Sequence, residues 1–259
     1  MIIEARQLGF AYRALPVLRG VDIHLGPGIT GVVGPNAAGK STLLKCLCGI
    51  LHPSGDVRIQ GRDLRTFSGR ELARIVSYLP QDLSSRADLT VFETVLLGRA
   101  HELGWRVSRD DLRAAAALMG ELRIADLGDR RIGELSGGQL QMVAIAQALS
   151  RQPQVLLMDE PTSSLDMEHQ FSICSWVRRL TDARGITTVM ALHDLNIAAR
   201  FADTVCVLEA GRIRCCGPPA KVLTEEIIRS VYRVSARVEI DPGGRPLVTA
   251  LGLADLIGP

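Results

Sequence analysis

The hydrophobic and polar positions form blocks that predict strands followed by helices. Between the strands, helical periodicity is found at 40–48, 71–74, 168–182 and 195–201. Strands that alternate with helices indicate an α/β fold. Short apolar runs, typical of strands buried on both faces of a parallel sheet, occur at 2–8, 21–25, 29–33, 57–60, 75–79, 155–158, 187–192 and 205–208.

Residues 86–150 depart from this alternation. This segment contains no convincing strand, but it contains three stretches with helical periodicity, at 90–99, 109–119 and 139–149. We therefore expect an all-helical insertion over 86–150, within an α/β core.

The pattern changes again after residue 219. A short helix near 220–232 and two strand-like pieces around 241–246 predict a small appendage. The expected division is therefore an α/β core of residues 1–85 and 151–219, the helical insertion, and a C-terminal appendage of residues 220–259.

Composition limits the class of protein. The 259 residues are 47% hydrophobic and 22% charged, as in ordinary globular proteins. The net charge of +2 and the ten aromatic residues do not favour nucleic-acid binding. The longest uncharged stretch, residues 23–39, is interrupted by glycine and proline and is shorter than the roughly 20 apolar residues of a membrane span. The N-terminus has no basic segment before an apolar core, so we expect no secretory signal.

The six cysteines form no C-x-x-C pair. They are residues 46, 48, 174, 206, 215 and 216, and four of them lie inside apolar runs. We expect reduced thiols in a cytosolic protein rather than disulfides or metal ligands, with the adjacent Cys215 and Cys216 as the pair most open to oxidation.

One segment fits the pattern G-x-x-x-x-G-K-[ST] of phosphate-binding loops. An apolar strand precedes it and a helix follows, a context that disfavours a chance glycine-rich turn. Backbone N–H groups and the helix N-terminus would hold phosphates, Lys40 would reach the β- and γ-phosphates, and Ser41 would bind Mg²⁺. The segment consists of Gly34, Pro35, Asn36, Ala37, Ala38, Gly39, Lys40, Ser41 and Thr42.

Two carboxylates end the apolar strand at 155–158. Asp159 and Glu160 are expected at the sheet edge where α/β proteins bind ligands. Asp159 would hold Mg²⁺ and Glu160 would polarise the attacking water. The alternative is that two acidic residues only end a strand and cap the next turn.

A second glycine motif stands before the helix at 139–149. A serine and two glycines at a helix start form another nest of phosphate size. One chain has little need of two such nests, unless the second serves another copy. The motif consists of Leu135, Ser136, Gly137, Gly138 and Gln139.

Together these motifs resemble those of the ATP-binding cassette (ABC) ATPases, over about residues 2–215. The L-S-G-G-Q string is the signature motif of that family. Tyr12 is similar to the aromatic residue that stacks on adenine, Gln81 to the Q-loop and His193 to the switch histidine. The D-loop is matched by Ser164, Leu165 and Asp166.

The resemblance implies a P-loop NTPase fold of the ABC type: a mixed sheet, an antiparallel β subdomain and an inserted helical subdomain. It also implies an ATPase with ATP and Mg²⁺ as cofactors. Two copies would face each other head to tail, with the signature of one copy on the ATP of the other. Lys40, Gln81, Glu160 and His193 would be catalytic, and Mg²⁺ would be held by Ser41, Gln81 and Asp159.

The chain departs from the family at two places. Ala37 stands where glycine is usual, which would cost roughly 1 kcal/mol if that residue has a positive φ. Leu140, Gln141 and Met142 stand where Arg-Gln-Arg is frequent, so two cations near the facing ATP are missing. The remaining histidines, at 24, 52, 101 and 169, show no ligand spacing and are interpreted as surface or packing residues.

A narrower resemblance, over residues 97–101, 192–196 and 198–200, points to ATPase subunits of bacterial importers. The tail at 231–234 and 241–246 is similar to the subgroup that serves iron(III)-siderophore, haem and cobalamin permeases. This resemblance implies separate permease subunits, indirectly a substrate-binding protein, and a peripheral position on the cytoplasmic face of the membrane. The alternatives are an unspecialised tail on an importer of another class, a regulatory cassette without activity, and a non-transport ABC protein acting on ribosomes or DNA. For the coiled coil of DNA-repair members, the 95 residues between Ser41 and Ser136 are too few.

Overall fold

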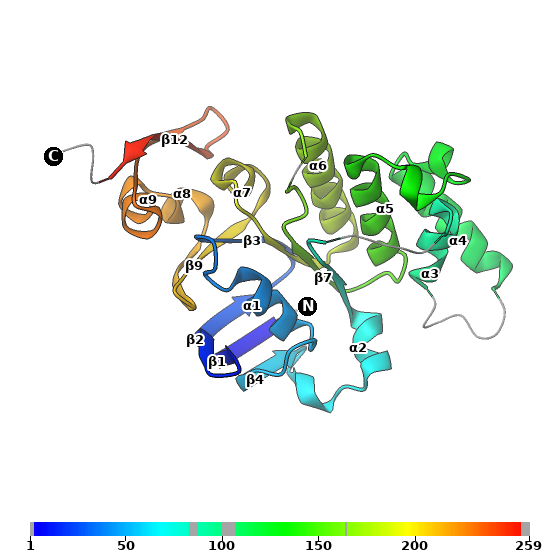
Figure 1. The fold of residues 1–259 in the computed structure, drawn as a ribbon, viewed down its shortest axis with the longest axis horizontal. Coiled ribbons are helices and arrows are strands. Elements are labelled where there is room, and N and C mark those ends of the chain that lie inside the picture. Colours follow the sequence, from blue (N-terminus) through cyan, green and yellow to red (C-terminus); the bar gives the residue numbers. More distant parts are fainter. Residues whose placement is uncertain (1–2, 83–87, 100–106, 164, 255–259) are drawn as a thin grey trace.

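The core of the protein is a six-stranded mixed sheet (Figure 1). The computed structural model describes residues 3–82, 88–99, 107–163 and 165–254. Four strand pairs of the sheet are parallel, and one edge pair, β9 with β10, is antiparallel. Its order is β10 (Arg212–Gly217), β9 (Thr204–Glu209), β3 (Gly28–Val33), β8 (Thr187–Ala191), β7 (Val155–Asp159) and β6 (Val76–Leu79).

The central strands contribute alternate residues to two hydrophobic cores. On β7, Leu156 and Met158 belong to one core, while Val155 and Leu157 belong to the other. All five residues of this strand are buried. Because both faces are covered, such strands appear in the sequence as continuous apolar runs rather than as alternating ones.

One face of the sheet is covered by an antiparallel subdomain and by helix α1 (Lys40–Leu47) (Figure 1). The subdomain is a four-stranded sheet in the order β2-β1-β4-β5. Helix α2 (Gly69–Ile75) follows it and leads into β6. The elements of the subdomain are β1 (Ile3–Tyr12), β2 (Leu15–Leu25), β4 (Ser54–Ile59), β5 (Arg62–Asp63) and the short helix η1 (Leu64–Thr66).

The opposite face packs against α6 (Met167–Arg184) and α7 (Leu195–Phe201), and the helical segment continues the same core. Within the described residues of 88–150 there are helices and a single isolated bridge, between Thr90 and Arg131. Capping boxes begin three of these helices, at α3, α4 and α5. The elements are α3 (Val91–Leu97), α4 (Arg109–Glu121), η2 (Ala125–Leu127), η3 (Ile132–Glu134) and α5 (Gly137–Leu149).

The C-terminal appendage lies at the other end of the molecule from α4 (Figure 1). It consists of α8 (Pro219–Val222), α9 (Glu225–Tyr232) and a hairpin of β11 (Val234–Ile240) and β12 (Pro246–Leu253). Asn196 of α7 holds this hairpin through two hydrogen bonds. Its Nδ2 donates to the carbonyl oxygen of Val248 at 3.1 Å, and its Oδ1 accepts from the Val248 N–H at 2.8 Å.

The expected fold is confirmed: a mixed sheet, an antiparallel β subdomain and inserted helices. The sequence pattern did not predict strand β10, because Arg212 and Arg214 interrupt its apolar character.

The expectation that all cysteines are reduced thiols is wrong for two of them. Cys206 and Cys216 are register partners on β9 and β10 and form a disulfide, whereas Cys215 next to Cys216 is a free thiol.

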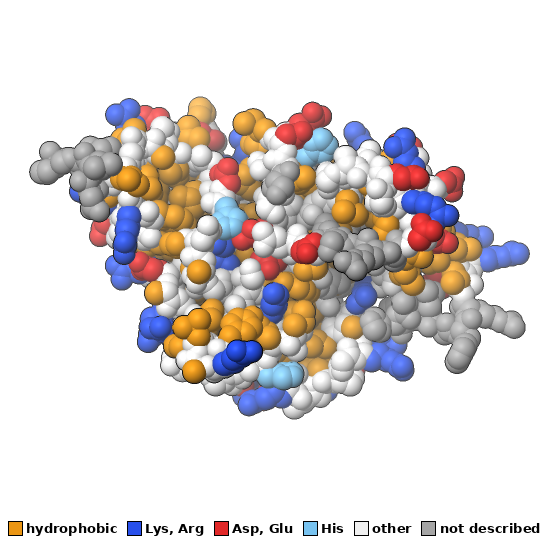
Figure 2. All heavy atoms as spheres, in the orientation of Figure 1, with side chains coloured by type: hydrophobic (Ala, Val, Ile, Leu, Met, Phe, Trp, Pro, Cys, Tyr) orange, Lys and Arg blue, Asp and Glu red, His pale blue; other side chains and the backbone are white. Residues whose placement is uncertain are grey.

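Charged side chains of both signs are interspersed over the face shown in Figure 2. This distribution agrees with the net charge of +2. Among the described helices, none combines the length and the apolar character that crossing a membrane requires.

We expect Asn196→Ala to release the C-terminal hairpin while the core stays folded. The substitution leaves the N–H and carbonyl groups of Val248 without their partner, at a cost of about 1–3 kcal/mol to the docked state. Hydrogen exchange should therefore become faster across β12 and stay unchanged in β3 and β7. Asn196→Asp keeps the acceptor for the Val248 N–H and should show a smaller effect. Equal exchange in β12 of wild type and Asn196→Ala would show that this contact does not hold the hairpin.

Candidate functional site

Three parallel strands bring the candidate residues to one edge of the sheet. The register places Val32 of β3 beside Ala191 of β8, and Ala191 beside Asp159 of β7. The phosphate loop follows Val32, His193 follows Ala191 by two residues, and Glu160 comes directly after Asp159. Segments that are more than a hundred residues apart in the sequence therefore meet at the carboxyl ends of the strands, where α/β sheets bind ligands.

The phosphate loop curls between β3 and α1. Gly34 is required there because a β-carbon at this position would collide with the backbone carbonyl oxygen of Leu208 on β9. Lys40 is buried, and its Nζ donates to the carbonyl oxygens of Gly34 at 2.9 Å and Pro35 at 3.2 Å. The ammonium group thus lies inside the ring of backbone that would surround a phosphate.

Burial lowers the pKa of the Lys40 ammonium, and the negative charges of Glu160 and Asp159 oppose this effect. A phosphate group would add further negative charge beside the ammonium. The site therefore favours an anionic ligand on electrostatic grounds.

Two residues of the site have left-handed backbone that glycine adopts more easily. Ala37 has a φ of 61° and Glu160 a φ of 51°. Ala37 therefore has the positive φ that makes alanine less favourable than glycine at this position. The conformational cost is about 1–2 kcal/mol for each of the two residues. At Glu160 this conformation turns the chain directly after β7. The turn is held by hydrogen bonds from Glu160 N–H to the carbonyl oxygen of Ala191 and from the N–H and hydroxyl of Ser163 to the carbonyl oxygen of Glu160.

Asp159 is buried and accepts two hydroxyl hydrogen bonds. Ser41 donates to its Oδ1 at 2.8 Å, and Tyr78 donates to its Oδ2 at 3.1 Å. Burial, with the charge of Asp159 as a second cause, raises the pKa of Tyr78 far above its ordinary range, so the phenol stays a donor. Tyr78 was not among the expected site residues, because a single tyrosine in an apolar strand looks like a packing residue.

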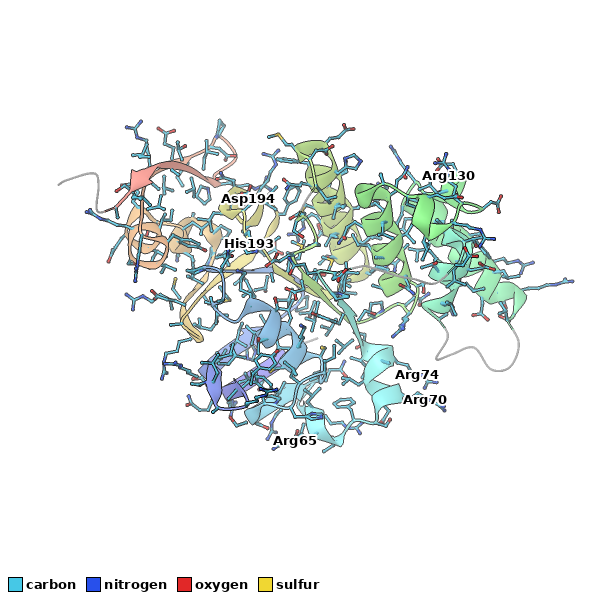
Figure 3. All side chains as sticks on the ribbon, in the orientation of Figure 1. Arg65, Arg70, Arg74, Arg130, His193 and Asp194 are labelled. Atoms are coloured by element: carbon cyan, nitrogen blue, oxygen red, sulfur yellow. A yellow bond between two sulfur atoms is a disulfide. The ribbon has the colours of Figure 1, made fainter. Side chains whose placement is uncertain are left out.

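Glu160 lies between Gln81 and His193. Gln81 Nε2 donates to Glu160 Oε2 at 2.7 Å, and His193 Nε2 contacts Glu160 Oε1. The side chain of Glu160 is only 11% exposed, whereas that of His193 is 45% exposed. Figure 3 shows His193 and Asp194 at the start of α7. Asp194 caps that helix by accepting from the N–H groups of Asn196 and Ile197, which fixes the chain next to His193.

The phosphate loop from Asn36 onwards lines one cleft of about 510 Å³ together with Gln81, Glu160 and His193. Gly34, Pro35 and Asp159 are not among its lining residues. Tyr12 does not line it: its ring is 45% exposed and packs edge-to-face on Phe10, with centroids 4.9 Å apart. Adenine stacking on Tyr12 therefore stays a prediction. The lining residues are Val17, Asn36, Ala37, Ala38, Gly39, Lys40, Ser41, Thr42, Gln81, Glu160 and His193.

The signature motif does not take part in this cleft. Ser136 caps α5 by accepting from the N–H of Gln139, and Gln139 Oε1 accepts from the N–H of Ser136. Leu135 packs on the hydrophobic core beneath, and Gly138 is buried while Gly137 is exposed.

The described part of the D-loop also forms a helix cap. Asp166 Oδ1 accepts from the N–H of His169 at the start of α6. Leu165 packs on the core, and Ser164 lies outside the described residues.

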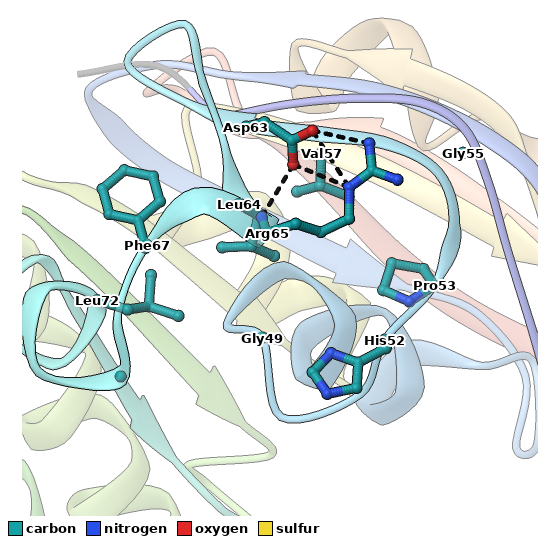
Figure 4. A pocket seen from close by; sticks show the side chains of 11 residues that line it. Gly49, His52, Pro53, Gly55, Val57, Asp63, Leu64, Arg65, Phe67 and Leu72 are labelled. Atoms are coloured by element: carbon teal, nitrogen blue, oxygen red, sulfur yellow. Dashed lines mark hydrogen bonds and ion pairs between the residues drawn. The ribbon is translucent and has the colours of Figure 1, made fainter.

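Further hollows lie outside this cleft. A groove of about 320 Å³ runs beside Gln81, between β6 and α5, and is lined among others by Leu79, Gln147 and Arg151. A separate pocket of about 320 Å³ lies between the antiparallel subdomain and α2 (Figure 4). Its walls are largely apolar, and Asp63 and Arg65 in its lining form a surface ion pair with each other.

Sequence comparison decides the family. The sequence profile of the family described as "ABC transporter" matches residues 18–163, more than half of the chain. The chain belongs to the ABC transporter family. It is an ATPase of that family.

Two relatives match more than nine-tenths of this ABC ATPase. The hemin import ATP-binding protein HmuV of Rhodopseudomonas palustris is 38% identical over 256 residues, which is 95% of this chain and 96% of that protein. The ferric enterobactin transport ATP-binding protein FepC of Escherichia coli is 34% identical over 255 residues, 96% of this chain and 94% of that protein.

Solved structures have the same fold. The structure of cbiO1 from Clostridium perfringens, part of the ABC transporter complex cbiONQ, has a TM-score of 0.78 at 28% identity and covers 88% of this chain and 92% of that one. The dimeric structure of MJ0796, a bacterial ABC transporter cassette, has a TM-score of 0.76 at 25% identity and covers 84% and 98%.

We expect Ala37→Gly to stabilise the ATPase by about 1 kcal/mol, because glycine adopts a φ of 61° without strain. Urea denaturation should show a higher midpoint with an unchanged slope. The matched control is Ala38→Gly, at the neighbouring buried position with no positive φ, which should lower the midpoint. If both variants shift the midpoint in the same direction, the positive φ at Ala37 does not lower the free energy of unfolding.

Proposed function

We propose that this ABC ATPase energises the import of iron-bearing chelates, either haem or iron(III)-siderophores. The ATP hydrolysis in this proposal rests on one observation. A single cleft is lined by the phosphate loop, Gln81, Glu160 and His193. The choice of cargo rests on relatives that are named for hemin import and ferric enterobactin transport and that match this chain over more than nine-tenths of its length.

Within the proposed site, the phosphate loop and Lys40 hold the β- and γ-phosphates. Ser41 and Asp159 present oxygen atoms 2.8 Å apart, a donor set that suits Mg²⁺. Magnesium bound there with ATP would neutralise phosphate charge. Gln81 is a third candidate ligand, because it lines the same cleft as Ser41.

The catalytic step assigned to this site is attack of water on the γ-phosphorus. Glu160 is positioned to orient that water and to accept its proton, because its carboxylate is enclosed and held at both oxygens by Gln81 and His193. The bond to the β-γ bridging oxygen breaks and releases ADP and phosphate. Catalysis of this kind depends mainly on positioning and on electrostatic stabilisation.

The active unit of the proposal is a dimer of this chain, in which the signature of one copy closes over the ATP of the other. Leu135, Ser136, Gly137, Gly138 and Gln139 do not line the cleft of their own chain, which supports this arrangement. The dimeric cassette of similar fold supports it as well.

We further propose that permease subunits dock in the groove beside Gln81. This groove joins Leu79 and Pro80, next to Gln81, to Ala144 and Gln147 of α5, so an inserted segment would contact the catalytic cleft and the signature helix at once. The ATPase would then lie peripherally on the cytoplasmic face of the membrane and respond indirectly to a substrate-binding protein.

We expect Glu160→Gln to lower ATP turnover at least about a hundredfold, because the amide cannot accept the proton of the attacking water. ATP binding and ATP-dependent dimerisation should persist, because Gln keeps the size of the side chain and one of its two acceptor atoms. Phosphate release and sedimentation velocity measure the two effects. Near-normal hydrolysis by this variant would remove Glu160 from its proposed role.

We expect Gln147→Trp to uncouple the ATPase from its permease by filling the groove. The isolated variant should hydrolyse ATP at close to the wild-type rate, whereas the stimulation by a co-reconstituted iron-chelate permease should be lost. Gln154→Trp, which enlarges a side chain at a different hollow, serves as the control. Full stimulation of Gln147→Trp would show that the permease docks elsewhere.

A further inference from the structure

A histidine that the nucleotide cleft does not use touches the signature motif. A β-carbon at Gly138 would collide with Cδ2 of His169 and would lie 3.0 Å from Cγ and Nε2 of the same ring. The imidazole therefore covers the position where any other residue would place its side chain. The sequence interpretation of His169 as a mere surface or packing residue missed this contact, because the two residues are 31 positions apart and lie on different helices.

The same ring is tied to the D-loop. Asp166 Oδ1 accepts from the N–H of His169 at 2.9 Å and contacts its ring Nδ1 at 2.6 Å. Both contacts hold the pKa of Asp166 below its ordinary range, and the hydrogen bond from the His169 N–H is the larger cause. The carboxylate therefore stays charged and continues to accept hydrogen bonds. One edge of the imidazole is thus fixed by Asp166, while the opposite edge faces Gly138.

An apolar side chain would fill this space equally well, but it could not bind Asp166. Next to the ring, Leu165 approaches the other signature glycine, with its Cδ2 4.0 Å from a β-carbon placed at Gly137. The segment 165–169 therefore lies beside both glycines. Figure 1 shows the N-terminal ends of α5 and α6 side by side, where this contact lies.

We infer that His169 is a positioning residue that fixes the signature glycines against the D-loop of the same chain. Gly138 is required because the ring of His169 occupies the space beside it, and not only because a partner's ATP must approach. This inference rests on the proposed composite site. It adds that each signature is aligned from within its own chain before the second copy arrives.

The test is a double-mutant cycle on ATP-dependent dimerisation, in a Glu160→Gln background that prevents turnover. The variants are His169→Ala, His169→Asn, Gly138→Ala and the double variant Gly138→Ala/His169→Ala, with His52→Ala as a histidine control at a distant exposed position. Sedimentation equilibrium with Mg-ATP gives the dimer dissociation constant. Binding of a fluorescent ATP analogue to the dilute monomer reports on the phosphate loop and the fold.

We expect His169→Ala to weaken dimerisation about tenfold and to leave monomer nucleotide binding within about twofold of the control. His169→Asn, whose amide can still donate to Asp166, should recover most of the loss. Gly138→Ala should be far more damaging than His169→Ala. The double variant should dimerise about tenfold better than Gly138→Ala alone, because the clash with the ring has gone.

Two results overturn the inference: dimerisation of His169→Ala at the control level, or a double variant no better than Gly138→Ala. The second result would mean that the partner's nucleotide alone sets the requirement for glycine. If the Glu160→Gln background itself shows no dimerisation with Mg-ATP, the proposed composite site fails, and the inference fails with it.

Discussion

The parallel register of β3, β8 and β7 is the constraint on which the site depends. Val32, Ala191 and Asp159 lie side by side across the three strands, and each strand is followed at once by a functional segment. A shift of one residue in any pair would turn the alternating side chains to the opposite core, which both hydrophobic cores prevent. The stability of the sheet interior and the geometry of the cleft therefore have one physical origin.

Backbone strain is present where this register ends, as it is at several turns elsewhere in the described residues. Ala37 and Glu160 have positive φ angles beside the cleft, and hydrogen bonds from neighbouring strands and loops hold the chain at Glu160 in its turn. Buried charge is concentrated there too. Lys40 and Asp159 would each be costly alone, but Lys40 donates to backbone carbonyls, and Asp159 accepts from two hydroxyl groups. A nucleotide phosphate would pair with the positive charge of Lys40, and its metal ion would pair with the negative charge of Asp159.

Patterns confined to one segment of the chain could be predicted well. Helix α7 begins at Leu195 and ends at Phe201, as the periodicity of 195–201 indicates, because Asp194 caps it locally. The phosphate loop follows its strand and starts its helix in the same way. The helical character of the segment before the signature could also be predicted, since capping boxes are local.

Contacts between distant segments could not be predicted. Tyr78 reaches Asp159 only because β6 pairs with β7, and Cys206 meets Cys216 only because β10 returns along β9. His169 touches Gly138 only because two helix ends lie side by side. Each of these residues looked ordinary in the sequence, since its partner is determined by the tertiary fold rather than by spacing.

In the proposed function, one chain contains half of an ATPase that a second copy completes. The most direct test is the turnover per chain of the purified wild-type protein with Mg-ATP, measured over a range of protein concentrations, with Lys40→Ala as the inactive control. We expect turnover per chain to rise with concentration until the dimer is saturated, and Lys40→Ala to show none. A turnover per chain that is constant down to concentrations at which the protein is monomeric would contradict this proposal.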